Sequence, residues 1–367
     1  LMSLKKDNFS ILDKKYMKLA INLAENQKNN TGLNPSVGCI IVKNNEISSY
    51  GSTYFNGRPH AESIALKKNQ NNNKGSTLYI TLEPCSHYGK TPPCTNLIIK
   101  SKIKKVIYSK NDTDDRSKCK AKKILLYKKI NCKSGLLKNT TKELYKEYDY
   151  IRKYKMPYVV GKIACTKNNY IYIDNKPITN RHSKSVSHIL RSQNDAILTS
   201  YKTINNDNPK LTCRLQGLNE KSPKRVILDS DLKVKLNSYV IRNSKFPKTF
   251  IFHDCNNRKK ITKLKKLGVK VIKLKTTNNR RFNLKNVLTK MYKLGFHRIL
   301  TEFGKNLTYH MVIEKYFNDF YLFKSDKISN RHESLNVSKI INKLNKNYKK
   351  KENLNTYLEN DNIVHYC

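Results

Sequence analysis

Helix-like and strand-like hydrophobic patterns alternate along the first half of the chain. Over residues 13–29, apolar side chains recur at the three- and four-residue spacing of one helix face. Apolar runs at 37–43 and 48–55, joined by a turn at Asn44 and Asn45, predict an antiparallel hairpin. Further helices are expected over 59–68, 95–101, 118–129 and 140–153, and strands over 78–81 and 105–109. The alternation predicts a layered α/β domain over residues 1–153.

A second α/β pattern follows a basic bridge at residues 154–156, and it predicts a second domain over 157–367. The expected strands cover 158–165, 196–200, 225–229, 249–253, 269–274 and 298–302, and the expected helices cover 184–192, 284–293 and 307–315. The segment 339–348 consists mostly of Lys and Asn, so we predict that it is poorly ordered. The tail after about residue 326 is left unassigned.

The charge of the chain is extreme, but its composition does not favour a nucleic-acid partner. Among 367 residues there are 74 Lys+Arg against 27 Asp+Glu, giving a net charge of +47. Lys, Asn, Ile and Tyr, whose codons are AT-rich, are abundant, whereas there are only 12 Gly, 10 Pro and no Trp. We therefore interpret the charge as codon bias, since a phosphate-reading surface would favour Arg forks and interleaved aromatic residues. Nucleic acid is not an expected partner.

Hydropathy and cysteine content set the expected compartment. No apolar run approaches the roughly 18 residues that a membrane span requires, and residues 1–6 carry no apolar stretch of signal-peptide type. We therefore expect a cytoplasmic protein without a membrane partner. Nine Cys in such a chain indicate thiols or metal ligands rather than a disulfide framework.

A candidate metal site lies in the first half of the chain. The candidate ligands are His60 in PHAE, and Cys85 and Cys94 in PCSHYGKTPPC. One imidazole and two thiolates suit a catalytic Zn²⁺ that keeps its fourth position for water, and Glu62 could carry the proton beside it. The set matches the zinc-deaminase signature, except that eight residues separate the two cysteines. An alternative is that His87 is a fourth ligand, which would make the site closed and structural.

These motifs resemble the riboflavin-biosynthesis deaminase/reductase (RibD) family. The first-half segments that carry the resemblance are NPSVGCIIVKNNEI, PHAE and TLEPCSHYGKTPPC; those of the second half are HILRSQNDAILTSYKTINNDNPKLTCR, RVILDS and LTEFG. The resemblance covers roughly residues 10–325. It implies a cytidine-deaminase-like three-layer α/β sandwich followed by a dihydrofolate-reductase-like α/β domain.

The resemblance also implies two successive reactions on a small phosphorylated pyrimidine. A zinc-dependent hydrolytic deamination of 2,5-diamino-6-(5-phosphoribosylamino)pyrimidin-4(3H)-one would come first, and an NADPH-dependent reduction of its ribosyl group to a ribityl chain would follow. One alternative is an active deaminase whose reductase half is no longer catalytic. A further alternative, raised by the charge, is an RNA or tRNA deaminase. A homo-oligomer is left open.

The resemblance assigns roles to residues position by position. It implies that His60, Cys85 and Cys94 are zinc ligands and that Glu62 is the catalytic proton shuttle. The substrate-binding positions that it implies are Asn34, Lys90, Asp112, Asn175, Arg191, Leu211, Arg214 and Glu302. The cofactor-binding positions that it implies are Ala164, Pro177, Thr203, Asp207, Ser230 and Gly304.

Three departures from the family pattern bear on these roles. Thr53 stands where the family usually has His. The loop that begins at Asp112 lacks the family's two later glycines, one of which is replaced by Cys119, so we expect a different loop backbone. Pro177 stands where the family has a Trp on the cofactor side, and a proline cannot stack on nicotinamide as an indole can.

Overall fold

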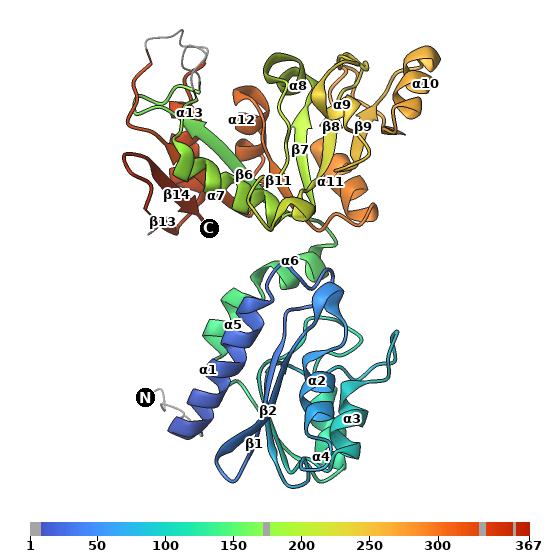
Figure 1. The fold of residues 1–367 in the computed structure, drawn as a ribbon, viewed down its shortest axis with the longest axis vertical. Helices are drawn as coiled ribbons and strands as arrows, with labels where there is room; N and C mark the ends of the chain where they lie inside the picture. The colour runs from blue at the N-terminus through green and yellow to red at the C-terminus, as the bar shows by residue number, and fades with distance from the viewer. Residues whose placement is uncertain (1–8, 172–176, 330–334, 355–356) are drawn as a thin grey trace. The chain divides into compact units, whose positions relative to one another are not determined.

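The computed structural model describes residues 9–171, 177–329, 335–354 and 357–367, and it forms two compact units. The first unit comprises residues 1–155 and the second comprises residues 156–367 (Figure 1). Within the described residues, no helix has the length and apolar character that crossing a membrane would require.

The first unit is built on a five-stranded sheet with the strand order β2-β1-β3-β4-β5. Its strands are β1 (Gly38–Lys43), β2 (Glu46–Ser52), β3 (Thr77–Leu82), β4 (Lys105–Lys110) and β5 (Asn131–Ser134). The predicted hairpin is confirmed, because β1 and β2 are antiparallel and the turn residues Asn44 and Asn45 both have positive φ. Strands β3, β4 and β5 are parallel, so their carboxyl ends meet at one edge.

Helices cover both faces of this sheet, which makes the first unit a three-layer sandwich (Figure 1). On one face, Met17 and Ala20 of the first helix pack against Ile40 and Tyr79. Gly38 permits this approach, since a Cβ there would lie 1.8 Å from the Ala20 carbonyl oxygen. The opposite face packs against the next three helices. The helices are α1 (Ile11–Asn26), α2 (Ala61–Lys68), α3 (Cys94–Lys100), α4 (Ala121–Tyr127), α5 (Lys138–Leu144) and α6 (Lys146–Tyr154).

The second unit contains a nine-stranded sheet with the order β10-β9-β8-β7-β11-β6-β12-β14-β13. All neighbouring strands are parallel except that β14 runs antiparallel to both β12 and β13. The strands are β6 (Tyr158–Cys165), β7 (Ala196–Ser200), β8 (Lys224–Leu228), β9 (Thr249–His253), β10 (Lys270–Lys273), β11 (Arg298–Thr301), β12 (Asp319–Lys324), β13 (Lys351–Asn353) and β14 (Asn362–Tyr366).

The main core of the second unit lies between this sheet and three of its helices, α11, α12 and α13. Phe320, Leu322 and Val364 face that core from the strands, while Met291 and Leu344 face it from the helices. The helices of the unit are α7 (Arg181–Ser192), α8 (Tyr201–Asp207), α9 (Tyr239–Arg242), α10 (Arg258–Lys266), α11 (Leu284–Lys293), α12 (Lys305–Ile313) and α13 (Ser338–Asn347).

The prediction that residues 339–348 are poorly ordered is wrong. Ser338–Asn347 forms helix α13, which buries Ile340 and Leu344 fully while its Lys and Asn side chains lie mostly toward solvent. The Lys/Asn-rich composition concealed an amphipathic period of four residues. The strands β5, β12, β13 and β14 were not predicted either, and the pairing of β14 with β12 brings the unassigned tail into the sheet.

Replacing Leu344 by Ala tests whether α13 is part of the core. We expect the free energy of unfolding of the second unit to fall by about 2–5 kcal/mol, the usual cost of truncating a fully buried leucine. Lys346→Ala on the exposed face of the same helix is the control, with an expected change within about 0.5 kcal/mol. Equal effects of the two substitutions, measured by urea unfolding, would show that α13 is not packed as described.

Candidate active sites

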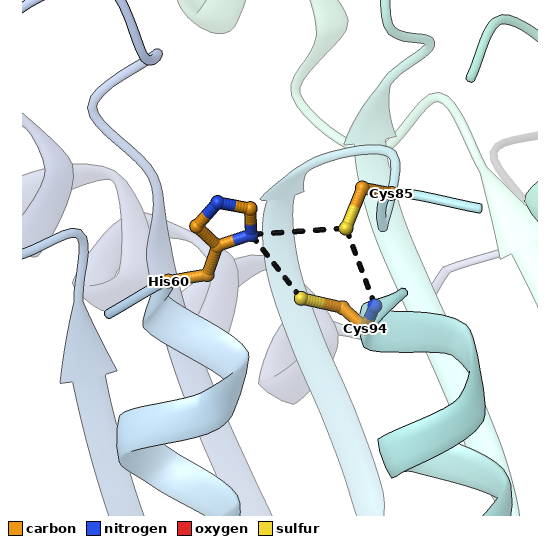
Figure 2. A group of neighbouring side chains, drawn as sticks. All are labelled: His60, Cys85 and Cys94. Atoms are coloured by element: carbon orange, nitrogen blue, oxygen red, sulfur yellow. Dashed lines mark hydrogen bonds between the residues drawn. The ribbon is translucent and has the colours of Figure 1, made fainter. Parts of the chain in front are cut away.

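The predicted zinc ligands converge where two helices of the first unit begin. His60 is the residue that precedes α2, Cys94 is the first residue of α3, and Cys85 lies in the loop after β3. The His60 Nδ1 atom lies 3.3 Å from Cys94 Sγ and 3.7 Å from Cys85 Sγ, and the Cys94 backbone N–H donates to Cys85 Sγ at 3.2 Å (Figure 2). Their donor atoms all lie within 4.8 Å of one another. One imidazole and two sulfurs at this separation fit Zn²⁺ with one position left for water.

The two thiols of this group differ in their acidity. Hydrogen bonding with the Cys94 thiol, aided by His60 and opposed by burial, lowers the pKa of Cys85 to about 4. The same Cys85–Cys94 hydrogen bond, together with burial, raises the pKa of Cys94 well above its usual value. The shared hydrogen bond therefore favours proton loss at Cys85 over Cys94, and binding of a metal ion by both sulfurs would release thiol protons.

Glu62 lies in the first turn of α2 with only 4% of its surface exposed. Burial raises the pKa of its carboxyl group, and the nearby His60 charge opposes that shift. Glu62 interacts with the Cys94 side chain and lines the same cavity as His60 and Cys85, so a buried carboxyl lies beside the candidate metal site. A carboxyl in this position can exchange a proton with a water molecule at the metal.

His87 is not a member of this ligand group. Its Nδ1 atom lies 2.7 Å from the Ser117 hydroxyl oxygen, and the ligand group comprises only His60, Cys85 and Cys94 among the described residues. The structure therefore supports an open three-ligand site over the closed four-ligand alternative.

A cavity of about 400 Å³ opens beside the candidate zinc site. His60, Glu62 and Cys85 line it, and so do the three substrate positions that were implied for this half of the chain, Asn34, Lys90 and Asp112. Thr53, which stands at the family's His position, is also part of the lining, and its hydroxyl accepts a hydrogen bond from the Val37 backbone N–H.

Sequence reasoning missed three arginines in the same cavity, Arg58, Arg116 and Arg152. Asp114 accepts a bidentate hydrogen bond from Arg116 and lies 3.6 Å from Arg152, and these partners hold the pKa of Asp114 well below its usual range against burial. Arg58 donates to the Thr91 hydroxyl at 2.7 Å. Within the described part of the chain, no carboxylate forms an ion pair with Arg58 or Lys90, so these two cations can bind an anion.

Glu83 fixes the loop that departs from the family pattern. Its carboxylate accepts backbone N–H groups from Asp112 at 3.1 Å, Cys119 at 2.9 Å and Ala121 at 3.0 Å. Cys119 has φ 59°, the left-handed conformation that glycine favours. A non-glycine residue therefore adopts the left-handed form at this position, and the expected change of the loop backbone stays a prediction. The segment TLEPC places Glu83 directly after a strand and two residues before the ligand Cys85, and this position could have marked Glu83 as a residue that supports the site.

In the second unit, two predicted substrate positions, Arg191 and Glu302, form an ion pair whose side chains are 13% and 15% exposed. Arg191 of α7 donates from Nε and Nη2 to the two carboxylate oxygens of Glu302, both at 2.8 Å, and from Nη1 to the Thr212 carbonyl at 3.2 Å. Burial acts to raise the pKa of Glu302, but Arg191 and Lys162 lower it to about 2. Glu302 is therefore ionised at neutral pH, and the bidentate geometry fixes both side chains.

Lys162 of β6 is a residue of this group that the sequence did not reveal. Burial lowers the pKa of its ammonium group, while Glu302 opposes that shift. The same environment lowers the pKa of His188 to about 4, through burial and the charges of Arg191 and Arg214. The sequence could not single out Lys162, because one lysine among so many in this chain is not distinguished by any motif.

The predicted cofactor positions gather at one edge of the second sheet. Ala164 is at the carboxyl end of β6, while Thr203, Ser230 and Gly304 follow the carboxyl ends of β7, β8 and β11. These four strands are neighbours in the sheet, and ligands of open α/β sheets bind at this edge. Gly304 precedes α12 without a side-chain cap, and a Cβ there would meet nothing within 4 Å, so a phosphate could approach the helix start. This edge fits a dinucleotide such as NADPH.

Three of the remaining implied positions of the second unit, Asp207, Leu211 and Arg214, lie at the end of α8 or in the segment after it. Asp207 ends α8, and burial raises the pKa of its carboxyl group. Leu211 is buried with φ 52°, and the Arg214 backbone N–H donates to His188 Nδ1 at 3.4 Å. Pro177 is exposed, and its carbonyl accepts the Lys327 ammonium at 2.8 Å. Asn175 lies outside the described residues.

Family models match both halves of the chain. Residues 10–110 match the cytidine and deoxycytidylate deaminase zinc-binding region, and residues 150–328 match the RibD C-terminal domain. The riboflavin biosynthesis protein RibD of Aquifex aeolicus is 36% identical over 349 residues, which cover 94% of this chain and 96% of that protein. The chain belongs to the RibD family. A RibD of Bacillus amyloliquefaciens is 34% identical and covers 85% of this chain and 84% of its own length.

Solved structures agree with the family assignment. A diaminohydroxyphosphoribosylaminopyrimidine deaminase/5-amino-6-(5-phosphoribosylamino)uracil reductase from Thermotoga maritima has a TM-score of 0.79 at 27% identity, covering 97% of this chain and 99% of that one. RibD of Acinetobacter baumannii has a TM-score of 0.81 at 24% identity, covering 97% and 98%, which shows the shared fold. The expected fold class is confirmed: a cytidine-deaminase-like sandwich and a dihydrofolate-reductase-like domain.

Family membership makes this chain an enzyme of riboflavin biosynthesis that joins a zinc-binding deaminase region to a RibD reductase domain. Zinc and NADPH are the cofactors implied by these two domains, and the residues at both sites fit them.

Replacing Cys85 by Ser tests the ligand assignment. We expect the zinc affinity of the first unit to fall by more than about 100-fold. Loss of a group that only orients a ligand costs about 10–100-fold, and this substitution removes a coordinating thiolate itself. Hydrogen exchange of the α2 and α3 amides, measured with and without zinc, reports on this site alone. Cys119→Ser is the control, since its exposed thiol lies outside the ligand group. Unchanged zinc-dependent protection in Cys85→Ser would refute the ligand.

Proposed function

We propose that the first unit hydrolytically deaminates 2,5-diamino-6-(5-phosphoribosylamino)pyrimidin-4(3H)-one, and that the second unit then reduces the ribosyl group with NADPH. The observation that carries the first step is the buried Glu62 carboxyl beside the His60, Cys85 and Cys94 donor set in one cavity. The Thermotoga maritima protein of similar structure is named as a deaminase and reductase with this same pair of activities.

For the deamination step, a zinc ion held by His60, Cys85 and Cys94 would supply Lewis-acid polarisation of a water molecule. Glu62 accepts the proton that this water loses and delivers it to the amino group that leaves as ammonia. The raised pKa of Glu62 suits both directions of this transfer. Asn34 donates from Nδ2 to the Gly57 carbonyl at 2.9 Å, which fixes the orientation of its amide toward the pyrimidine.

The substrate phosphate is assigned to Arg58 and Lys90. Both residues line the cavity, and both lack a carboxylate partner among the described residues, whereas Arg116 and Arg152 are already paired with Asp114. Arg58 presents a planar fork that matches a phosphate, and Lys90 adds a mobile point charge. A phosphorylated pyrimidine is therefore held with its base at the zinc group and its phosphate at these cations.

NADPH bound at the carboxyl edge of the second sheet would supply the hydride that reduces the ribosyl group at C1′. Opening of the ribose ring also requires a proton for the ring oxygen, and we assign its donation to the Lys162 ammonium, which interacts electrostatically with Glu302. Glu302 and Arg191 lie beside Lys162 and fix each other through two hydrogen bonds. Their side chains therefore keep the same positions when a polar substrate binds. Arg214 is exposed near this group and can contact the substrate phosphate.

The alternative of a non-catalytic reductase half has one specific observation in its favour. Pro177 replaces the family's Trp and is exposed, so no aromatic ring is available at that position to stack on nicotinamide. The intact Arg191–Glu302 pair and the four cofactor positions at the sheet edge favour an active reductase.

Replacing Glu62 by Gln separates proton transfer from metal binding. We expect deamination to fall by at least about 10²–10⁴-fold, the usual contribution of a positioned acid–base group, with unchanged zinc content. Glu143→Gln, an exposed carboxylate on α5, is the control with normal turnover. Deamination is measured as ammonia release. Normal turnover by the zinc-loaded Glu62→Gln protein would remove Glu62 from the mechanism.

NADPH oxidation with the deaminated product tests the second activity. We expect the purified chain to consume NADPH, and Lys162→Met to lower this rate by about 10²-fold or more because the proton donor is lost. Lys263→Met on the exposed face of α10 is the control with an unchanged rate. If the unmodified chain deaminates its substrate but leaves NADPH absorbance constant, the reductase half is a non-catalytic scaffold.

A further inference from the structure

A second group of metal-binding side chains lies at the C-terminal edge of the nine-stranded sheet. Glu352, His365 and Cys367 offer a carboxylate oxygen, an imidazole nitrogen and a thiol sulfur within 4.8 Å of one another. Only this group and the group at His60 bring three such donors together among the described residues. The second group lies beyond residue 328, where the match to the RibD C-terminal domain ends.

Strand register explains why these three side chains meet. Glu352 of β13 is directly opposite His365 of β14 in an antiparallel pair. Cys367 is two residues after His365, so it projects from the same face of the sheet. Its backbone N–H donates to the Lys350 carbonyl at 3.2 Å, which continues the pairing to this position. Directly opposite residues in antiparallel strands have Cβ atoms about 4.5–5.5 Å apart, close enough to share a ligand.

The imidazole of His365 is held in place on this face. It stacks on Tyr321 of β12, with ring centroids 4.3 Å apart and an angle of 6° between the ring planes. Its Nε2 atom is buried without a hydrogen-bond partner, and the nearest carboxylate atom recorded for it, Asp319 Oδ1, lies 3.7 Å away. A metal-bound imidazole is commonly oriented by a carboxylate at its other nitrogen, and Asp319 can take that part.

We propose that Glu352, His365 and Cys367 form a second divalent-metal site, suited to Zn²⁺, that ties β13 to β14. Zinc accepts this mixture of nitrogen, sulfur and oxygen ligands. Zinc–ligand distances of about 2.0–2.3 Å place two ligands at most roughly 4.5 Å apart, so small side-chain rotations complete the site. Lys350 lies 2.8 Å from Glu352, but both side chains are about half exposed, and such surface pairs yield readily to a metal ion.

The site would stabilise the pairing of the strands that connect it to Lys162, the residue beside the Arg191–Glu302 pair. Glu352, His365, Tyr321 and Lys162 occupy successive positions across β13, β14, β12 and β6. Zinc at Glu352 and His365 would hold the outer strands in register and keep the Tyr321 ring next to Lys162. Its role is structural, and it is independent of the deamination and reduction steps.

Zinc stoichiometry of the full-length chain tests the proposal. We expect about two zinc ions per chain after equilibration in a zinc buffer, and about one in Cys367→Ser or His365→Gln. Glu352→Gln, on a side chain that is about half exposed, should weaken binding of the second ion by at least tenfold. Cys255→Ser is the matched control, because this thiol lies 4.0 Å from His253 without a third ligand, and it should retain both ions.

Cobalt substitution gives a second measurement that does not depend on activity. In a Cys85→Ser/Cys94→Ser chain, Co²⁺ should still produce a sulfur-to-cobalt charge-transfer band, and further replacement of Cys367 by Ser should abolish it. A band that survives removal of Cys367, or a single zinc ion in both the unmodified chain and Cys367→Ser, would overturn the proposal. Failure of deamination or NADPH oxidation would leave these metal counts unchanged, so the two proposals fail separately.

Discussion

The carboxyl edge of parallel strands is the constraint on which both active sites depend. In the first unit, Cys85 follows β3 and Asp112 follows β4, while His60 and Cys94 stand at the starts of the helices beside this edge. In the second unit, Thr203, Ser230 and Gly304 follow neighbouring parallel strands in the same way. Parallel strands place their carboxyl ends together, so residues far apart in the chain meet there without special local sequence.

The electrostatics of each site depend on specific ion pairs and not on the net charge of +47. Arg191 and Glu302 form a largely covered ion pair in the second unit, and Asp114 forms ion pairs with Arg116 and Arg152 in the first. A buried charge without a partner would be costly, so these pairs fix side chains that substrates then meet in one geometry. Most of the lysines contribute to none of these pairs, which agrees with the interpretation of the charge as codon bias.

The C-terminal segment shows how a biased composition conceals structure. Lys and Asn dominate 339–348, yet Ile340 and Leu344 recur with the helical period and close the core of the second unit. The Lys and Asn residues of this segment mostly face solvent, whereas the buried Ile340 and Leu344 decide whether it folds as a helix. β14 then pairs antiparallel with β12, whereas the strands from β10 to β12 are parallel. The sequence did not predict this pairing, because β12 and β14 are distant in the chain.

The sequence by itself determined the α/β alternation, the hairpin at Asn44 and Asn45, and the identity of the residues in the candidate zinc group, because periodicity, turn chemistry and ligand type are local properties. Tertiary structure alone decided that His87 stays outside that group and that Arg58 is a cation without a carboxylate partner among the described residues. It also decided that Lys162 lies beside the Arg191–Glu302 pair. These facts depend on which side chains meet across strands and loops, and that distance is set by packing rather than by neighbouring residues in the chain.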